Sequence, residues 1–400
     1  MIDASTLGER IRNVRRRRGL TQRELASAAG VSESFIKKLE QGSITDARLE
    51  TVHKIATALT VSTTKLAAGP DAEAAQPADV TAWEPVRLAL EGRYTSRPDE
   101  EPTLAGVEDA FTALVPLLTA NKFDELRLVF PALLRDADTL VSALVDGQQA
   151  RARRLRSQAR QVGSLLMSHT WQFGPASSAI ADAIDDAATD PLVMFGAVDE
   201  QCWGLLRAGA LTEARQLAEH WAAAAEPARI THATPGELAV WGRLCLRVSS
   251  VAVRDNRQEE AAEALRHAQI AAAGLHRDSR LTATPWQVFG PATVAAIEAE
   301  NAVIQGYPEQ TLNVTHTLTA QQFPVSRHYW RSQLDKARAL AMTRRHTEAI
   351  EVLRATRNAA PQWLVQQRGA RDTLTMAINA RKRTLTPEIR ELADAVRLPL

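Results

Sequence analysis

The sequence contains very few cysteines and no long apolar run. Its 400 residues include two cysteines, Cys202 and Cys245, whose separation fits neither a metal-ligand nor a redox motif. Reduced thiols are therefore expected, as in cytosolic proteins. No apolar run approaches the ~18 residues of a membrane span, and the first ten residues, MIDASTLGER, lack the apolar core of a secretion signal. We expect a soluble cytoplasmic protein without membrane contact.

Motifs that carry catalysis are also missing. The sequence has no glycine-rich phosphate loop, no nucleophile elbow and no pair of histidines at metal-binding spacing. Its nine histidines are scattered, so we expect structural roles for them. These absences predict that the protein is not an enzyme and needs no metal or cofactor.

One cluster of carboxylates stands beside an arginine-rich segment. Asp182, Asp185 and Asp186 could suggest a catalytic carboxylate pair, but surface charge pairing with the arginines explains them better. The alternative role for the arginines is contact with the flanks of bound DNA. The arginines are Arg151, Arg153, Arg154, Arg156 and Arg160.

Charge is distributed unevenly along a chain long enough for two or three domains. The net charge is only +1. Residues 1–66 contain 12 Lys and Arg against 7 Asp and Glu, an excess of +5, whereas the remaining residues have an excess of −4. A small basic head joined to a mildly acidic body indicates nucleic-acid contact at one end only.

The most informative segment of the head is residues 21–39, TQRELASAAGVSESFIKKL. Gly30 separates two groups of apolar residues at helical spacing, which predicts two short helices packed at a steep angle. Thr21 and Glu24 form a capping-box pattern for the first of these helices, and Ser32 can cap the second. The second helix exposes a polar face that could enter a DNA groove, made of Glu33, Ser34, Lys37 and Lys38.

Further apolar stripes complete an all-helical domain over residues 5–66. They predict a first helix at 7–18 ended by Gly19, a fourth helix between Leu49 and Leu59, and a short fifth helix marked by Val61 and Leu66. The alternative is a helical hairpin whose basic face is merely solvated. The complete five-helix context favours DNA binding.

The segment LGERIRNVRRRRGLTQRELASAAGVSESFIKKLEQG, followed by LETVHKIATALTV, resembles the Xre family of phage-repressor (Cro/C1-type) helix-turn-helix regulators. The resemblance implies a lambda-repressor-like domain that binds double-stranded DNA. It also implies that Gln22 binds a phosphate and the adjoining base, and that Arg15 pairs with Glu40 as part of the scaffold.

The same resemblance implies that the exposed early residues of the third helix read base edges. Glu33 either accepts a hydrogen bond from cytosine or only excludes wrong sequences by repulsion. The expected DNA contacts are Thr21, Gln22, Ser32, Glu33, Ser34, Lys37, Lys38 and Ser43.

Residues 67–80, AAGPDAEAAQPADV, are predicted to be a linker between the head, residues 1–66, and a helical body, residues 81–400. The body shows helical periods and no strand alternation. The predicted helices are 83–91, 104–119, 123–145, 149–172, 176–188, 192–208, 212–225, 235–253, 258–273, 291–304, 309–320, 326–343, 347–358, 362–382 and 387–396.

Four segments of the body repeat one order of features: a helix end, a polar turn, an acid and an apolar-rich helix. The equivalent turns fall at Asn121, Gly209, Asn256 and Arg345. This pattern resembles degenerate tetratricopeptide repeats over residues 104–382, which implies an α-solenoid of antiparallel helix pairs.

The segment WQVFGPATVAAIEAENAVIQGYPEQTL is similar to the C-terminal half of actinobacterial regulators that join an Xre head to such repeats. Those proteins often contain FGPTNV, where this chain has FGPATV with Thr293 in place of the asparagine.

Several tryptophans fall in the first helices of these repeats, which line the concave side of a tetratricopeptide superhelix. The rings could form the wall of a groove for a peptide or small effector, joined by a few polar side chains. The alternative is that they pack between repeats. The expected effector contacts are Trp203, Trp241, Trp286, Gln287, Asn301, His328, Tyr329 and Trp330.

Together these patterns predict an all-α, sequence-specific transcriptional regulator. We expect a homodimer that binds a palindromic operator and whose body senses a peptide or small-molecule effector. The alternative is an interaction scaffold, in which the repeats hold a protein partner and the head anchors it to DNA.

Overall fold

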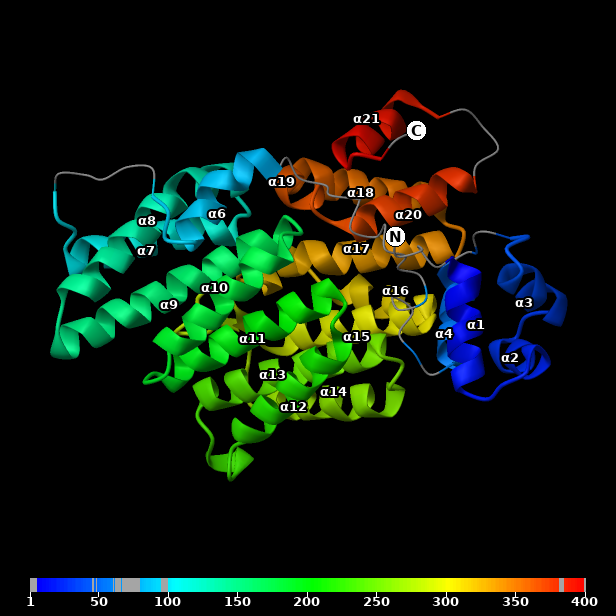
Figure 1. Cartoon of the computed structure of the whole chain (residues 1–400), viewed down its shortest axis with the longest axis horizontal. Helices are drawn as coiled ribbons and strands as arrows, with labels where there is room; N and C mark the ends of the chain where they lie inside the picture. Colours follow the sequence, from blue (N-terminus) through cyan, green and yellow to red (C-terminus); the bar gives the residue numbers. More distant parts are fainter. Residues whose placement is uncertain are drawn as a thin grey trace.

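A small helical head lies beside a larger helical body in the computed structural model of the chain (Figure 1). The structure describes residues 6–44, 47, 49–59, 61, 66, 80–94, 100–380 and 385–398. Over these ranges the fold is all-α, as predicted, with one two-stranded sheet. None of the helices in them combines the length and the apolar character needed to cross a lipid bilayer.

Three of the four helices described in the head begin at residues whose side chains cap them: Thr6, Thr21 and Ser32. The predicted capping box is present, since Thr21 Oγ1 accepts a hydrogen bond from the Glu24 N–H at 3.1 Å and the Glu24 carboxylate accepts one from the Thr21 N–H at 2.7 Å. Ser32 Oγ accepts from the Phe35 N–H at 3.2 Å, as predicted. The helices are α1 Leu7–Arg17, α2 Gln22–Ala29, α3 Glu33–Glu40 and α4 Leu49–Ala58.

Two glycines allow these helices to approach closely. Gly30 ends α2 in the left-handed region, with φ 62°, and turns the chain into α3. Gly8 of α1 lies against the end of α3, where an added Cβ would be 1.8 Å from the carbonyl oxygen of Leu39. Leu66 belongs to the buried core of the head, whereas residues 62–65 of the predicted fifth helix lie outside the described residues.

The body is a succession of helices packed against their chain neighbours. Apart from one helix, the predicted ranges agree with the structure to within three residues. The predicted linker falls mostly on residues 67–79, which are not among the described residues. The elements are η2 Val80–Trp83, α6 Glu84–Leu90, α7 Leu104–Thr119, α8 Phe123–Ala143, α9 Asp146–His169, α10 Phe173–Asp186, α11 Pro191–Ala208, α12 Leu211–Ala224, η3 Ile230–His232, α13 Pro235–Arg254, α14 Gln258–Ala273, α15 Pro291–Gln305, α16 Pro308–Thr317, η4 Ala320–Gln322, α17 Ser326–Met342, α18 His346–Ala359, α19 Pro361–Leu364, α20 Arg368–Asn379 and α21 Pro387–Ala395.

One kind of turn recurs through the body. At six helix–helix connections a residue with positive φ stands two positions before the next helix begins. Three predicted turn residues are among them, whereas the predicted Arg345 is displaced by one position because Arg344 holds the positive φ. The six residues are Asn121, Trp171, Gly209, Asn256, Gly306 and Arg344, at intervals of 38–50 residues.

Two local predictions for the body are wrong. The predicted helix 362–382 is divided into α19 and α20, because Gln367 is extended and its side chain turns back to the Trp363 carbonyl at 3.1 Å. The expected absence of strands also fails, since β1 Ser279–Arg280 pairs antiparallel with β2 Val288–Phe289.

The two ends of the body share one apolar core. Buried residues of α7, α8 and α9 belong to the same cluster as residues of α17, α19 and α20. Two hydrogen bonds join the same regions: Asn121 Nδ2 donates to Ser326 Oγ at 3.1 Å, and the Asp124 N–H donates to Gln362 Oε1 at 3.1 Å. The two ends of the body therefore pack together, and the body encloses a pocket on several sides.

Candidate functional site

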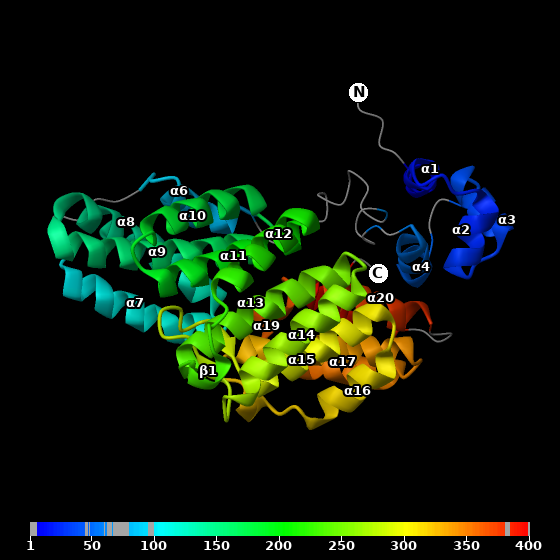
Figure 2. The same ribbon diagram turned by 90° about the horizontal axis from the view of Figure 1, so that it is seen from below.

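The third helix of the head is oriented by the residues it buries. Ile36 and Leu39 are fully buried against the other head helices, which leaves the opposite face of α3 in solvent. Figure 1 and Figure 2 both show α4 on the side of the head nearest the body, with α3 farther out. This exposed face carries Glu33, Ser34, Lys37 and Lys38.

A buried ion pair locks α1 to the end of α3. The predicted pair is present: Arg15 Nε and Nη2 donate to the two carboxylate oxygens of Glu40 at 2.6 and 2.8 Å, and Arg15 Nη1 donates to the Leu20 carbonyl at 2.7 Å. Gln22 Nε2 also donates to Glu40, at 2.8 Å. Burial acts to raise the pKa of Glu40, but these hydrogen bonds hold it below its ordinary value.

The other residues predicted to touch DNA lie around this helix. Thr21 is exposed and half-buried Gln22 follows it at the start of α2, while Ser32 and Ser43 are exposed at the two ends of α3. A primary amide has two N–H donors and a carbonyl acceptor, so one bond to Glu40 leaves Gln22 capacity for a phosphate or a base. The structure therefore brings the eight predicted residues to one end of the head, and their contact with DNA stays a prediction.

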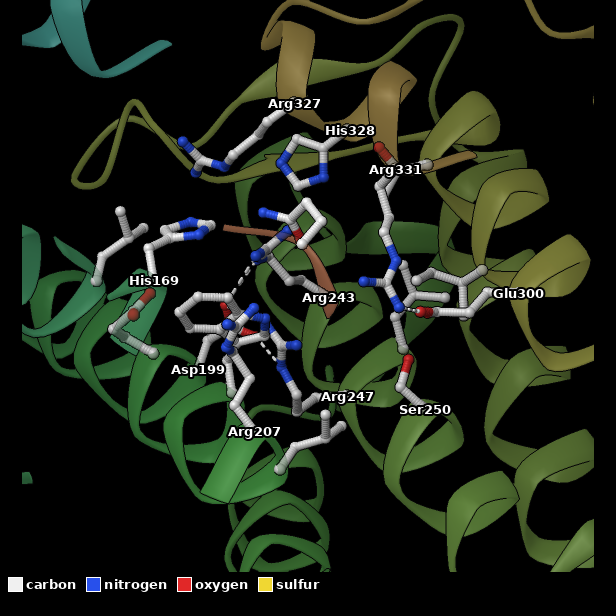
Figure 3. Close-up of a pocket in the computed structure, with 18 of the residues that line it drawn as sticks. His169, Asp199, Arg207, Arg243, Arg247, Ser250, Glu300, Arg327, His328 and Arg331 are labelled. Carbon is white, nitrogen blue, oxygen red and sulfur yellow. Dashed lines mark hydrogen bonds and ion pairs between the residues drawn. The ribbon is translucent and has the colours of Figure 1, made fainter. Parts of the chain in front are cut away.

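The interior of the body contains a pocket of about 170 Å³. One water molecule needs ~10–15 Å³ of such a cavity, so this cavity has room for several waters. Its walls come from α9, α11, α13, α15, α17 and α19 and from the segment between α19 and α20 (Figure 3). The charged and histidine side chains that line it are His169, Asp199, Glu200, Arg207, Arg243, Arg247, Arg254, Glu300, Arg327, His328 and Arg331.

Two carboxylates of the pocket are each held by two arginines. Arg243 Nη2 lies 2.8 Å and Arg247 Nε 3.0 Å from the oxygens of Asp199, which keeps the pKa of Asp199 low although burial acts to raise it. Arg254 and Arg331 approach one oxygen of Glu300 at 2.7 and 2.5 Å. Against burial, the two arginines lower the pKa of Glu300 to about 2. Within the pocket lining, four arginines therefore share two carboxylates, and Arg331 also lies 3.8 Å from Asp335 behind the lining.

Two further arginines of the pocket have no carboxylate partner. Among the described residues, no Asp or Glu lies within 4.0 Å of Arg207 or Arg327. The Nε and Nη2 atoms of Arg207 and Nη1 of Arg327 are buried without a hydrogen-bond partner in the described part of the chain. Burial lowers the pKa of Arg207 to about 9 and that of Arg327 to about 10, so both remain cations at neutral pH.

Aromatic rings hold the Arg207 guanidinium in place. Its central carbon lies 4.9 Å from the ring centroid of Trp171 and 5.0 Å from that of Trp203. Contacts of this geometry are attractive because the cation meets the negative face of the ring. Arg207 is thus fixed by stacking, while its Nε and Nη2 atoms keep unused hydrogen-bond donors.

The remaining titratable groups of the pocket are neutral at pH 7. Burial, reinforced by the charge of Asp199, raises the pKa of Glu200 to about 8. Burial and neighbouring arginines lower the pKa of His169 and of His328 well below the ordinary value. Neutral side chains here leave the positive charge of the arginines in excess.

Comparison with known proteins covers the head. Residues 6–68 match a family described as a helix-turn-helix domain. The presence of this domain supports the interpretation of the chain as a DNA-binding regulator. No curated protein and no solved structure matches the chain.

The structure brings only two of the eight predicted effector contacts to the pocket, Trp203 and His328. The buried ring of Trp286 packs against Phe111, with centroids 5.9 Å apart. Trp241 stacks on His267 at 5.8 Å.

The other four predicted contacts also have partners within the fold. Gln287 Nε2 donates to the Gly196 carbonyl at 2.9 Å, and Asn301 Nδ2 donates to Ser249 Oγ at 2.8 Å. Tyr329 packs against Trp330, with ring centroids 4.9 Å apart. These six side chains pack or form hydrogen bonds within the fold, and they do not line the pocket.

Sequence reasoning missed the arginines of the pocket. The signal was present on α13, where Arg243, Arg247 and Arg254 interrupt an apolar helix at spacings of four and seven residues. Such spacing places all three on one helical face. A row of arginines on a helix that is otherwise buried indicates an internal cationic site.

The acidic cluster outside the pocket pairs with the arginine-rich helix α9, as predicted. Arg156 Nη2 lies 2.6 Å from Asp186, and Arg160 Nη1 lies 2.7 Å from Asp182. The described residues contain no group of three or more His, Cys, Asp or Glu placed to hold a metal ion.

Proposed function

We propose that the chain is a sequence-specific, non-enzymatic transcriptional regulator whose body senses an effector. Residues 1–66 act as the DNA-binding domain, residues 67–80 as the linker, and residues 81–400 as a tetratricopeptide-like sensing and dimerisation domain. The exposed polar face of α3 supports DNA reading, and the cationic pocket supports sensing. The intervals of 38–50 residues between equivalent turns fit degenerate repeats longer than the ~34 residues of the ideal unit.

The observation that carries the sensing proposal is that helix α13 joins the pocket to the head. Helix α13 lines the pocket with three arginines and ends at the turn containing Asn256. There Thr57 Oγ1 of the head donates to Asn256 Oδ1 at 3.4 Å, and Asn256 Nδ2 donates to the Val61 carbonyl.

Helix α17 also extends from the pocket toward the head (Figure 1). Arg327, His328 and Arg331 of this helix line the pocket, and Arg338 lies two turns farther along it. Burial, with the nearby charge of Arg338, lowers the pKa of His53 on α4. The pocket and the contact with the head therefore share α13, and α17 places the charge of Arg338 near α4.

This arrangement gives effector binding a physical route to DNA binding. An effector that prefers one arrangement of α13 and α17 shifts the population of head positions. In a homodimer, the spacing of two heads must match half-sites about 34–36 Å apart. A small movement of α4 then changes operator affinity without altering the residues that read DNA.

The test is selection of bound DNA from random sequence with the full chain, followed by gel shifts on the selected operator. A palindromic product supports dimeric reading. We expect Lys38→Ala and Gln22→Ala each to weaken operator binding by about 1–3 kcal/mol. Lys122→Ala, an exposed lysine of the body, is the matched control and should leave binding unchanged. Unchanged affinity in both head variants would refute the assignment of α2 and α3 as the reading elements.

A further inference from the structure

We propose that the pocket binds a small organic oxyanion, a carboxylate or phosphate group attached to an apolar body, with Arg207 and Arg327 as its cationic partners. The inference rests on the proposed sensing function, because it names the chemical class of the effector. It depends on three features of the pocket: its charge balance, its unused donors and its mixed walls.

The charge balance of the pocket is positive. Six arginines and only three carboxyl groups line it. Four of the arginines pair with Asp199 and Glu300. The third carboxyl, Glu200, makes no ion pair with Arg207 or Arg327 within the described residues. Arg207 and Arg327 are half-buried, and Arg327 keeps one hydrogen bond, from Nη2 to the Trp286 carbonyl. A cation held partly out of water without a counter-charge is costly, so two of them beside one cavity suit that cavity to an anion supplied from outside.

The unused donors have the geometry of oxyanion recognition. A guanidinium presents parallel N–H groups that match the two oxygens of a carboxylate or phosphate. Arg207 keeps its plane because Trp171 and Trp203 stack on it at 4.9 and 5.0 Å. A fixed plane reduces the entropy lost when a ligand binds. His328, with a buried Nε2 that lacks a partner among the described residues, adds a neutral hydrogen-bonding group on the same wall as Arg327.

The rest of the wall is apolar, which argues for an organic ligand. Figure 3 shows the charged groups arranged around the cavity, with Arg327 and His328 on one side and Arg207 below them. The apolar lining consists of Leu165, Trp203, Leu206, Leu246, Ile297 and Trp363. An inorganic ion would satisfy the arginines but leave this surface uncovered, whereas an apolar body attached to the anion would bury it.

The experiment compares hexanoate with hexanamide, which has a similar shape and no charge, and includes hexyl phosphate and inorganic phosphate. Binding to the full chain is measured by calorimetry at constant ionic strength, up to about 10 mM ligand. We expect hexanoate or hexyl phosphate to bind at least about tenfold more tightly than hexanamide and than inorganic phosphate. Whichever of the two binds more tightly identifies the oxyanion.

Variants locate the site. Arg207→Gln and Arg327→Gln should each weaken binding of the preferred anion about tenfold or more. Arg345→Gln is the matched control, because this exposed arginine pairs with Glu348 at 2.6 Å away from the pocket, and it should bind as the unchanged chain does. Trp fluorescence during urea unfolding verifies that each variant is folded.

Four results would overturn the proposal. They are equal binding of hexanoate and hexanamide, undiminished binding by both pocket variants, binding of inorganic phosphate as tight as that of both organic anions, and no binding by any anion. A gel shift of the ligand-free chain on its selected operator is run in parallel. If the anions do not bind as expected but the chain binds its operator, only the proposed ligand class is rejected. If the chain does not bind an operator, the proposed regulatory function is rejected.

Discussion

Arg15 in the head is buried and Arg207 in the body is half-buried, yet the fold treats the two guanidinium groups in opposite ways. The nitrogens of Arg15 donate to Glu40 at 2.6 and 2.8 Å and to the Leu20 carbonyl at 2.7 Å. Arg207 has aromatic rings on it and two buried nitrogens without a hydrogen-bond partner in the described part of the chain. In the first arrangement all three nitrogens of the guanidinium make hydrogen bonds inside the fold, and in the second two of them stay available.

The difference separates scaffold from site. A buried ion pair in which every guanidinium nitrogen makes a hydrogen bond fixes one arrangement of the helices that carry it, here α1, α2 and α3. A buried cation that is left unpaired destabilises the ligand-free protein, and such destabilisation is typical of positions selected for binding. The comparison predicts opposite responses to substitution in the two regions.

The largest effect is expected at the satisfied pair. Glu40→Ala leaves the Arg15 guanidinium buried and uncompensated, which should cost the head about 3–5 kcal/mol of stability and abolish operator binding. All eight tryptophans lie in the body, so their fluorescence reports only on that part. Hydrogen exchange of the α1–α3 amides measures the loss. Glu33→Ala on the exposed face is the control and should change head stability by less than about 1 kcal/mol; equal protection in both variants contradicts the role of the pair.

The next effect is a pH dependence in the pocket. Glu200 faces Asp199, Arg243, Arg247 and Arg327, and burial raises its pKa to about 8 from an ordinary value of 4.5. The folded state therefore holds a proton that the unfolded state releases, so this contribution to stability is complete below about pH 4.5 and is lost as the pH rises through about 8.

Glu200→Gln removes that titration and keeps the neutral shape. We expect the variant to gain stability over the unchanged chain as the pH rises from 5 to 8, by an amount on the order of 2–4 kcal/mol at the upper end. Urea unfolding followed by Trp fluorescence at several pH values measures the difference. A stability difference that does not vary with pH would show that Glu200 ionises normally in the folded protein.

A smaller gain is expected when the unpaired cation is removed. Arg207→Met keeps an apolar side chain between the two tryptophans and eliminates the buried charge, so the ligand-free body should become about 1–2 kcal/mol more stable. Arg243→Met is the matched variant, because Arg243 pairs with Asp199 at 2.8 Å and its loss should destabilise the body. Urea midpoints from Trp fluorescence distinguish the two, and a loss of stability in Arg207→Met would place Arg207 in the scaffold with Arg15.

The head was more predictable from sequence than the pocket for a physical reason. The caps at Thr21 and Ser32 and the glycine at 30 act on neighbouring residues, so their pattern is visible in a short segment. The pocket assembles side chains that lie far apart in the chain, from Leu165 to Gln367, and no local pattern specifies that they meet. The turns were an intermediate case: Asn121 and Asn256 could be found because a left-handed turn favours asparagine, whereas Trp171 and Arg344 occupy the same conformation against that preference.

For the tryptophans, the local pattern suggested more pocket contacts than the fold makes. Large rings in successive helices are consistent with a groove, but the closure of the body buries Trp286 completely. Trp203 reaches the pocket because Arg207 lies one helical turn beyond it on α11 and stacks on its ring. The sequence pattern places the rings on the inner helices, but the tertiary contacts decide which rings line the pocket.

The smallest effect concerns the contact between the two regions. Asn256 has φ 59°, a conformation that glycine adopts without strain, so Asn256→Gly removes the hydrogen bonds to Thr57 and Val61 and keeps the turn. We expect the head to dock less tightly by about 1 kcal/mol, and hydrogen exchange at the α4 amides to quicken about fivefold, while body stability stays nearly constant. Asn121→Gly is the control, since this turn also has φ 59° but its side chain bonds Ser326 within the body. If α4 exchanges equally in both variants, the Asn256 turn does not hold the head, and the route from pocket to operator must run through α17 alone.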